Sequence, residues 1–270
     1  MPELPEVETI KRTLARNLPG RRIEDCEIRL AKLVSPSPKE FSSVLRGLIF
    51  QGLERRGKFL LLHLSRGFSL LCHFRLTGQL IYLPNGGPEP PHTHLCFKLD
   101  HGTLFYADLR QFGKLELLKT EALSTHPSLL KLGPEPFEIS PLAFFQILKR
   151  SRRKIKALLL DQTLLAGLGN IYVDESLFRA GIHPAREASS LSFEESKRLH
   201  EIICRTLKEA IATGGSSVRN YVDGEGKSGA FQERHLVYGK RGTPCPRCGA
   251  LITYTTIASR GTHFCPICQK

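Results

Sequence analysis

Four cysteines near the C-terminus constrain the fold of this chain more than any other feature. They form two Cys-x2-Cys pairs separated by sixteen residues, at Cys245, Cys248, Cys265 and Cys268. Two pairs at this spacing place four thiolates around a tetrahedral Zn²⁺. Because thiolates fill every coordination position, we expect one structural zinc ion rather than a catalytic one.

The residues between these pairs, TYTTIASRGTHF (253–264), are typical of a β-hairpin with Arg260 near its tip. Residues 219–270 carry eight Lys and Arg against three Asp and Glu. A small basic zinc hairpin of this kind most often contacts nucleic acid.

The whole chain is also basic. Its 39 Lys and Arg exceed its 26 Asp and Glu by 13 charges, which points to a polyanionic partner, either nucleic acid or an acidic membrane surface. The alternative is a basic protein with no such partner. No apolar run approaches the ~20 residues that span a bilayer, and MPELPEVETI does not have the pattern of a signal peptide, so we expect a cytosolic protein. In that compartment a disulfide interpretation of the paired cysteines is disfavoured.

Hydrophobic periodicity predicts a strand-rich first half and a helical second half. An amphipathic helix is expected over 5–18, and hairpins over 58–65 with 68–75 and over 94–99 with 103–108. A proline-punctuated segment (119–140) precedes helices expected over 154–165 and 171–180. Ser192 and Glu195 form a capping box for a long helix that continues to about residue 213.

Six of the eight residues from Lys149 to Lys156 are basic, and they open one of the expected helices. Cations at a helix N-terminus interact unfavourably with the helix dipole, so this run does not stabilise the helix. A cost of this kind favours a role in phosphate binding over the alternative of a solvated surface. The Gly167–Asn170 turn (GLGN) that follows this helix lets backbone N–H groups approach a phosphate.

The N-terminus offers a nucleophile. Removal of Met1 would expose the secondary amine of Pro2, whose pKa near ~8 leaves far more neutral amine at pH 7 than a lysine retains. Such amines attack sugar carbons to form Schiff bases, and Glu3 and Glu6 are available for proton transfer. The alternative is a solvated terminus that begins a helix.

Motifs along the whole chain resemble those of bacterial formamidopyrimidine-DNA glycosylases. They are MPELPEVETI, RRGKFLLL (55–62), CHFRLTGQL (72–80), ADLRQFG (107–113), KALLLDQTLLAGLGNIYVDESLF (156–178), HLVYGKRGTPCPRCG (235–249) and SRGTHFCPICQ (259–269). The resemblance implies an α+β multi-domain fold. Residues 1–130 would form a catalytic β-sandwich with the terminal helix, 131–235 a helix-two-turn-helix domain, and 236–270 the zinc finger.

The same resemblance implies a monomeric enzyme that removes oxidised purines from damaged double-stranded DNA and cleaves the abasic strand. Pro2 would be the nucleophile, Glu3 the general acid and base supported by Glu6, Lys58 the proton donor in β-elimination, and Arg260 the donor in δ-elimination. The other matched positions imply DNA contacts, at His73, His92, Arg110, Arg152 and Asn170; Lys156 is expected to bind phosphate as part of the basic run.

One position departs from the family pattern. Leu76 stands where many relatives have Met, the wedge that fills the space left by an extruded base. Leucine has a similar volume, so we expect the wedge to be retained. Arg110 and Phe112 would occupy the side of the unpaired partner base. The Gly-rich segment 216–231 matches the region that caps the extruded base and is expected to be mobile without DNA.

Two other interpretations remain open at this point. An endonuclease VIII-type glycosylase would share fold and chemistry but remove oxidised pyrimidines; the PELPEV start and the Arg110/Phe112 motif argue against it. A non-catalytic DNA-damage-binding zinc protein would lack the catalytic set, and the presence of all four of its members argues against that: Pro2, Glu3, Lys58 and Arg260.

Overall fold

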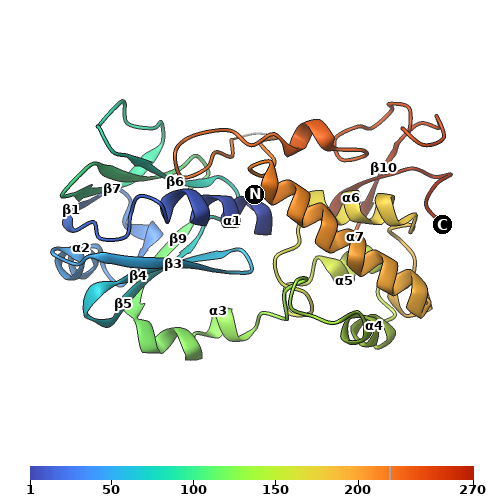
Figure 1. Cartoon of the computed structure of the whole chain (residues 1–270), viewed down its shortest axis with the longest axis horizontal. Helices are drawn as coiled ribbons and strands as arrows, with labels where there is room; N and C mark the ends of the chain where they lie inside the picture. Colours follow the sequence, from blue (N-terminus) through green and yellow to red (C-terminus); the bar gives the residue numbers. More distant parts are fainter. Residues whose placement is uncertain (219) are drawn as a thin grey trace. The chain divides into compact units, whose positions relative to one another are not determined.

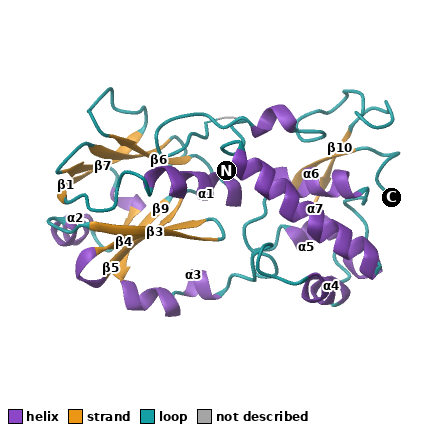
Figure 2. Cartoon of the chain, in the orientation of Figure 1, coloured by secondary structure: helices purple, strands orange, loops and turns teal. Residues whose placement is uncertain are grey.

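The computed structural model describes residues 1–218 and 220–270. The chain divides into two compact units, one formed by 1–130 with 213–230 and the other by 131–212 with 231–270. Nine of the eleven strands in the described residues belong to the first unit, whereas the second unit is mainly helical (Figure 2). No helix in the described parts of the chain is both long and apolar enough to cross a lipid bilayer.

The first unit is a β-sandwich (Figure 1). One sheet has the strand order β1-β7-β8-β6 and the other β2-β9-β5-β4-β3. The elements of this unit are α1 (Leu4–Leu14), β1 (Ile23–Ile28), β2 (Val34–Ser35), α2 (Pro38–Leu45), β3 (Phe50–Arg56), β4 (Phe59–Leu64), β5 (Phe68–His73), β6 (Gly78–Leu83), β7 (Thr93–Leu99), β8 (Thr103–Asp108), β9 (Lys114–Lys119) and α3 (Pro127–Leu130).

The core of this unit joins both sheets and the first helix. Phe97 and Tyr106 come from one sheet, Phe50 and Leu62 from the other, and all are at most 1% exposed. Helix α1 contributes the apolar face that its sequence periodicity predicts, with Ile10 fully buried. Each such buried side chain stabilises the folded state by about 1.5–3 kcal/mol. This burial holds α1, and with it the N-terminal residues, against the sandwich.

The second unit contains α4 (Pro141–Lys149), α5 (Ile155–Leu159), α6 (Asn170–Ala180), α7 (Phe193–Ala212) and the hairpin of β10 (Thr253–Ile257) and β11 (Arg260–Phe264). The capping box predicted for α7 is present, since Ser192 Oγ accepts from Glu195 N and the Glu195 carboxylate accepts from Ser192 N. The predicted hairpin positions in both units are confirmed.

Two predicted helices are shorter in the structure. The helix expected over 154–165 ends at Leu159, because Asp161 Oδ1 accepts from the backbone N–H and the hydroxyl of Thr163 and so forms a local turn that competes with the helix. The helix expected over 5–18 ends at Leu14, although Leu18 remains fully buried.

The domain boundaries also differ from the expected ones. Residues 213–230, expected within the helical domain, group with the first unit. Ser216 N donates to Glu6 Oε1 at 2.9 Å, and Gly224 N donates to Thr13 Oγ1 at 2.9 Å, so the segment is bonded to α1. The expected mobility of 216–231 stays a prediction, and its Arg219 lies outside the described residues.

The zinc-finger residues group with the helical unit and form no separate unit. Phe178 of α6 packs with Val237, Ile252 and Cys265 in one buried cluster. This shared core accounts for the grouping.

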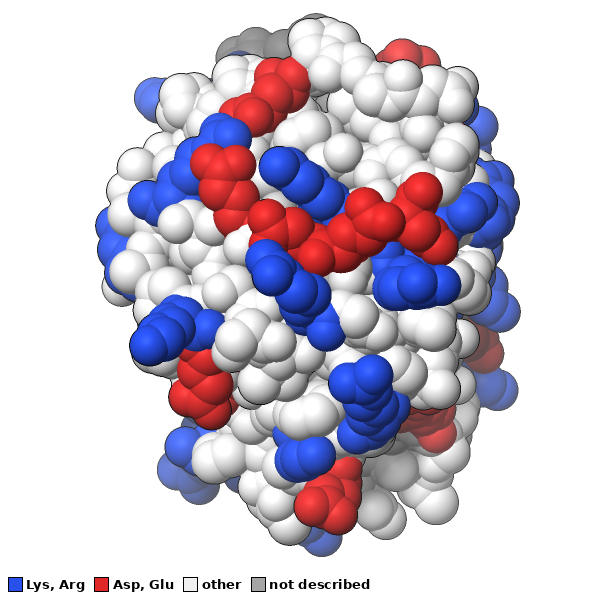
Figure 3. All heavy atoms as spheres, turned by 90° about the vertical axis from the view of Figure 1, so that its left-hand side faces the viewer, with Lys and Arg blue, Asp and Glu red and all other residues white. Residues whose placement is uncertain are grey.

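The positive charge of the chain is not spread evenly. Figure 3, seen from the end of the first unit that carries β1 and α2, shows Asp and Glu gathered in a band between Lys and Arg side chains. On β1, Asp25 pairs with Arg46 at 2.8 Å, and Glu27 pairs with Arg29 at 2.9 Å. A face of mixed and paired charge is a poor binding surface for a polyanion.

Candidate active site and zinc centre

The N-terminal residues of the first unit lie at the buried start of α1. Glu3 is 2% exposed and Glu6 is 1% exposed. The two form a capping box in which Glu3 N donates to Glu6 Oε2 at 2.8 Å. Because the other oxygen of Glu6 accepts from Ser216, the Glu6 carboxylate fixes the backbone of Glu3 and hence the position of Pro2. With Met1 in place the nitrogen of Pro2 is an amide, so a nucleophilic amine at this position requires removal of Met1.

Lys58 lies in the two-residue turn between β3 and β4, and not within a strand as expected. Its side chain is buried, which is uncommon for lysine. Gly57 adopts φ +57° at the first position of this turn, a conformation that glycine tolerates and that tight hairpins favour.

Sequence reasoning missed the side chain that joins this turn to α1. Arg55 donates from Nη1 to the carbonyl oxygen of Gly57 at 3.1 Å and from Nε to Glu8 Oε2 at 3.0 Å. Burial raises the pKa of Glu8, but hydrogen bonds from Lys11, Arg12 and Arg55 outweigh it and hold the pKa below its ordinary value. A charged Glu8 therefore links the Lys58 turn to the helix that begins beside Pro2 and Glu3. The Glu8–Arg55 pair is 47 residues apart in sequence, so no local pattern indicates it.

His73 lies at the end of β5, opposite Phe59, which follows Lys58. Burial, with smaller contributions from Arg75 and Lys58, lowers the pKa of His73 to about 4. Its Nδ1 accepts from Arg75 N at 3.0 Å, so the neutral ring carries its proton on Nε2. His73 can therefore donate one hydrogen bond to a phosphate but brings no charge to it.

The residues predicted to fill the extrusion site lie on two turns. Leu76 is half-buried on the turn between β5 and β6, while Arg110 and the 52% exposed Phe112 lie on the turn between β8 and β9. The guanidinium of Arg110 lies 5.1 Å from the centre of the Phe112 ring. An exposed ring with a cation over it can stack on a nucleic-acid base.

A cavity of about 350 Å³ lies within this unit. Its lining includes Thr77 and Asp108, together with Asn220, Tyr221 and Ser228 of the Gly-rich segment. His92 also lines the cavity; it is exposed and adopts a left-handed φ of +64°. The segment predicted to cap an extruded base thus contributes to the lining of a cavity large enough for a small ligand.

In the second unit, the structure brings Asn170 to the Arg260 hairpin. Asn170, the first residue of α6, donates from Nδ2 to the carbonyl oxygen of Gly261 at 2.8 Å. Arg260 is exposed directly after the hairpin turn. Arg152 is also exposed, in the loop before α5. All three positions are consistent with contact to a polyanion.

The structure contradicts the predicted phosphate contact of Lys156. Its side chain is 0% exposed, and its ammonium donates to Asp174 Oδ1 at 2.6 Å and to the carbonyl oxygen of Gly261 at 2.9 Å. A cation that is enclosed and paired in this way is not available to a phosphate. The sequence counts it within a basic run, but its neighbour Ile155 is also buried, so this end of the run turns into the core.

Glu175 is a second residue that sequence reasoning missed. Its buried carboxylate accepts the backbone N–H groups of Leu236, Val237 and Tyr238 at 2.9–3.0 Å. Adjacent Asp174 accepts from His263 N at 2.9 Å. Two consecutive carboxylates of α6 therefore hold two separate segments of the C-terminal region, one at 236–238 and one at His263. The sequence does carry a signal for this role. An acidic pair lies within the mostly apolar run NIYVDESLF, where a buried helix offers the two carboxylates no contact with solvent.

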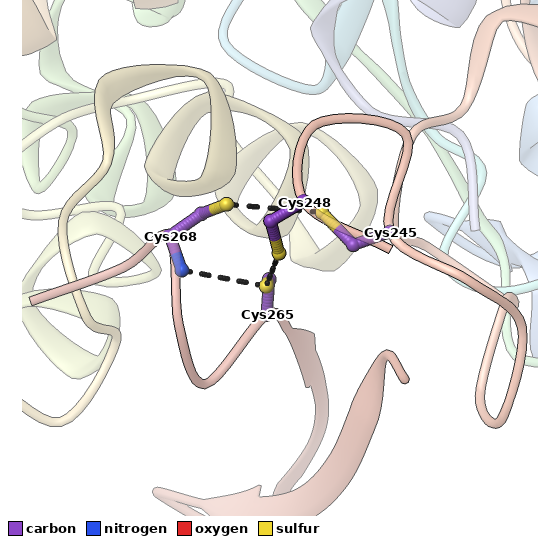
Figure 4. Close-up of side chains that lie close together, drawn as sticks. All are labelled: Cys245, Cys248, Cys265 and Cys268. Atoms are coloured by element: carbon purple, nitrogen blue, oxygen red, sulfur yellow. Dashed lines mark hydrogen bonds between the residues drawn. The ribbon is translucent and has the colours of Figure 1, made fainter. Parts of the chain in front are cut away.

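The four cysteines converge as predicted. Figure 4 shows Cys245 and Cys248 coming from one loop and Cys265 and Cys268 from another, and all four sulfur atoms lie within 4.8 Å of one another. The Sγ–Sγ distances are 3.9 Å for Cys245 with Cys268 and 3.5 Å for Cys248 with Cys265. A tetrahedral Zn²⁺ with Zn–S bonds of ~2.3 Å requires sulfur atoms about 3.8 Å apart, so the site fits zinc.

Backbone N–H groups donate to two of the four sulfur atoms. Arg247 N donates to Cys245 Sγ, and Cys268 N donates to Cys265 Sγ, both at 3.4 Å. Burial raises the pKa of Cys245, but such hydrogen bonds outweigh it and lower the pKa to about 7, whereas burial raises the pKa of Cys265 and the contact with Cys248 raises that of Cys268. A thiol near neutrality deprotonates readily for a metal.

Comparisons with known proteins agree with this geometry over the full length of the chain. Residues 1–115 match the formamidopyrimidine-DNA glycosylase N-terminal domain, 132–222 the H2TH domain of the same proteins, and 242–270 the zinc finger found in FPG and IleRS. The chain thus holds one structural zinc ion on its four cysteines.

Curated and solved relatives give the same result. The chain is 50% identical to a formamidopyrimidine-DNA glycosylase of Heliobacterium modesticaldum and 47% identical to one of Geobacillus kaustophilus, each covering 100% of both chains. A Lactococcus lactis Fpg in complex with N7-benzyl-Fapy-dG DNA superposes with a TM-score of 0.93 at 41% identity, covering 100% of both chains. Another complex of that enzyme, with DNA containing an abasic site, gives 0.93 at 41% identity and covers 99% of both chains. The chain belongs to the formamidopyrimidine-DNA glycosylase family.

Proposed function

We propose that this protein is a base-excision repair glycosylase that removes oxidised purines, namely 8-oxoguanine and formamidopyrimidines, and then cleaves the abasic strand. Full-length identity of 50% to a formamidopyrimidine-DNA glycosylase carries the assignment of activity. Complexes of a relative with Fapy-dG DNA and with abasic DNA support the choice of substrate. The double-stranded DNA that carries such lesions is the partner.

The N-terminal residues carry the chemistry. Once Met1 is removed, the Pro2 amine attacks C1′ of the damaged nucleotide, and the bond from C1′ to the base breaks. The electron pair of that bond leaves with the base, which is then protonated. Glu3 protonates O4′ as the sugar ring opens, and the product is an iminium ion between Pro2 and C1′. Glu6 holds the backbone of Glu3 in place through the capping box.

The iminium ion makes the two eliminations possible. It acidifies the C2′ proton, whose loss expels the 3′ phosphate, and then the C4′ proton, whose loss expels the 5′ phosphate. Water finally releases Pro2 from the sugar fragment and leaves a one-nucleotide gap. We assign Lys58 to β-elimination and Arg260 to δ-elimination. The zinc ion stabilises the Arg260 hairpin and takes no part in bond breaking, because four thiolates fill its coordination sphere.

The remaining candidate residues bind and deform the DNA. Asn170, Arg152 and His73 contact phosphates, a sequence-independent contribution that weakens as salt rises. Leu76 enters the stack as the damaged nucleotide is extruded, at a cost of a few kcal/mol. The extruded base occupies the cavity beside Thr77, with His92 at its rim. A single chain carries all of these groups, so a monomer suffices, and a chromosomal substrate places the enzyme in the bacterial cytoplasm.

Incision of a panel of defined duplexes tests this proposal. Wild-type protein should cut duplexes that contain 8-oxoguanine or formamidopyrimidine and leave phosphate on both sides of the gap. It should act weakly on duplexes that contain thymine glycol. Preferred cutting at thymine glycol would indicate the endonuclease VIII-type alternative. Lesion binding without any incision would indicate the non-catalytic one.

A further inference from the structure

Two turns of the first unit lie side by side at one end of the β6–β8 strand pair. The turn before β6 carries Leu76, and the turn after β8 carries Arg110 and Phe112. Strands β6 and β8 pair antiparallel, with Gly78 opposite Asp108, so the two turns project from the same end of the pair. The side chains that we assign to filling the extrusion site therefore come from neighbouring segments that are about 35 residues apart in sequence.

A hydrogen-bond network centred on the buried side chain of Asp108 joins these turns. Thr77 Oγ1 donates to Asp108 Oδ1 at 2.5 Å and accepts from Arg110 N at 2.9 Å. Asp108 Oδ2 accepts from Gly113 N at 2.8 Å, at the far end of the second turn. The Asp108 side chain is 1% exposed, so these bonds to its oxygens are strengthened by low-dielectric surroundings.

The backbone of both turns is held in a demanding conformation. Arg75, directly before Leu76, has φ +52°, and Gln111, between Arg110 and Phe112, has φ +56°. Residues with a side chain rarely adopt this region, and they remain there only when the surroundings hold them. Gly113 closes the second turn so tightly that a Cβ there would lie 1.6 Å from Tyr106 Oη.

We propose that the Thr77–Asp108 bridge is a positioning element for lesion extrusion, which locks the Leu76 turn to the Arg110–Phe112 turn so that both enter the duplex as one rigid body. This inference rests on the proposed function, since it concerns how the wedge is presented. Rigid presentation lowers the entropy lost on insertion, because the two turns are ordered before they meet DNA. Thr77 and Asp108 also line the cavity that we assign to the extruded base, so only their coupling to Leu76 separates a positioning role from direct contact with that base.

Thr77→Val tests the bridge, because valine keeps the shape of threonine and removes the hydroxyl. Loss of a hydrogen bond to a buried carboxylate should lower single-turnover excision of 8-oxoguanine from duplex DNA about tenfold. Strand cleavage at a preformed abasic site, where no stacked base must be extruded, should fall less than about twofold. Thr77→Ser restores the hydroxyl and should recover most of the excision rate.

A double-mutant cycle distinguishes a shared insertion element from two independent turns. If Leu76 and the second turn act as one body, Thr77→Val combined with Leu76→Ala should excise about as slowly as the slower single variant, because the effects are not additive. Additive losses, equal losses on duplex and abasic substrates, or normal excision by Thr77→Val would each overturn the bridge while wild-type excision stands. Wild-type protein that excises no lesion would instead overturn the proposed function, and the bridge's role with it.

Discussion

Replacing Lys156 with Met should destabilise the helical unit strongly. The ammonium of Lys156 lies 2.6 Å from Asp174 Oδ1, and both side chains are 0% exposed. Methionine has a similar length but leaves the Asp174 charge buried without this partner. Breaking a buried ion pair on one side costs about 3–5 kcal/mol. At roughly 4 °C per kcal/mol for a unit of this size, the unfolding midpoint should fall by roughly 12–20 °C.

Thermal unfolding of the zinc-loaded protein, followed by circular dichroism, measures this shift. Lys154→Met is the matched control, since Lys154 belongs to the same basic run but is exposed. Its midpoint should change little. Adding Asp174→Asn to Lys156→Met removes the unpaired charge and should recover part of the loss, because the amide oxygen can still accept from His263 N.

The same variants decide between the buried pair and the phosphate contact that the sequence predicts. If Lys156 is structural, variant protein that remains folded should show the wild-type dependence of DNA affinity on salt. A midpoint within about 2 °C of wild type, together with a salt slope reduced by about one unit, would refute this reasoning and restore Lys156 as a phosphate ligand.

Three further predictions concern zinc, the wedge and pH. Cys248→Ser should lower zinc content from about one ion per chain, as measured by elemental analysis, and weaken DNA binding; full affinity without metal would contradict this. Leu76→Ala should slow excision from duplex DNA more than cleavage at a preformed abasic site; equal slowing would count against the wedge. Since the pKa of His73 is about 4 when folded and near 6.5 otherwise, only the unfolded chain gains a proton as pH falls between these values. The free energy of unfolding, measured with urea, should therefore decrease as the pH is lowered across this window, and it should decrease less in His73→Gln. The same decrease in both proteins would refute the lowered pKa of His73.

The parts of the fold that follow local rules could be predicted from sequence. The cysteine spacing predicts the metal site, because ligand geometry depends on short loops. The Ser192/Glu195 capping box predicts the start of α7 because both groups act within one turn. Apolar runs that flank short turns predict the hairpins for the same reason.

Long-range pairings account for what could not be predicted. Lys156 belongs to a basic run, and only the fold places Asp174 beside it in the interior. The bond from Ser216 to Glu6 spans 210 residues, so nothing local assigns 213–230 to the sandwich unit. The early end of α5 depends on whether Asp161 turns back on Thr163 or continues the helix, and sequence periodicity does not distinguish these.

The central claim is that the amine of Pro2 is the nucleophile, and borohydride trapping on abasic and 8-oxoguanine duplexes tests it most directly. Protein from which Met1 has been removed should be captured covalently on both duplexes. Protein that retains Met1 should bind them without being trapped, because an amide nitrogen cannot attack C1′. Glu3→Gln should trap on the abasic duplex and fail on the 8-oxoguanine duplex, where the base must first leave. Efficient trapping of the Met1-retaining protein would contradict the account and identify a side-chain amine, with Lys58 the first candidate, as the nucleophile.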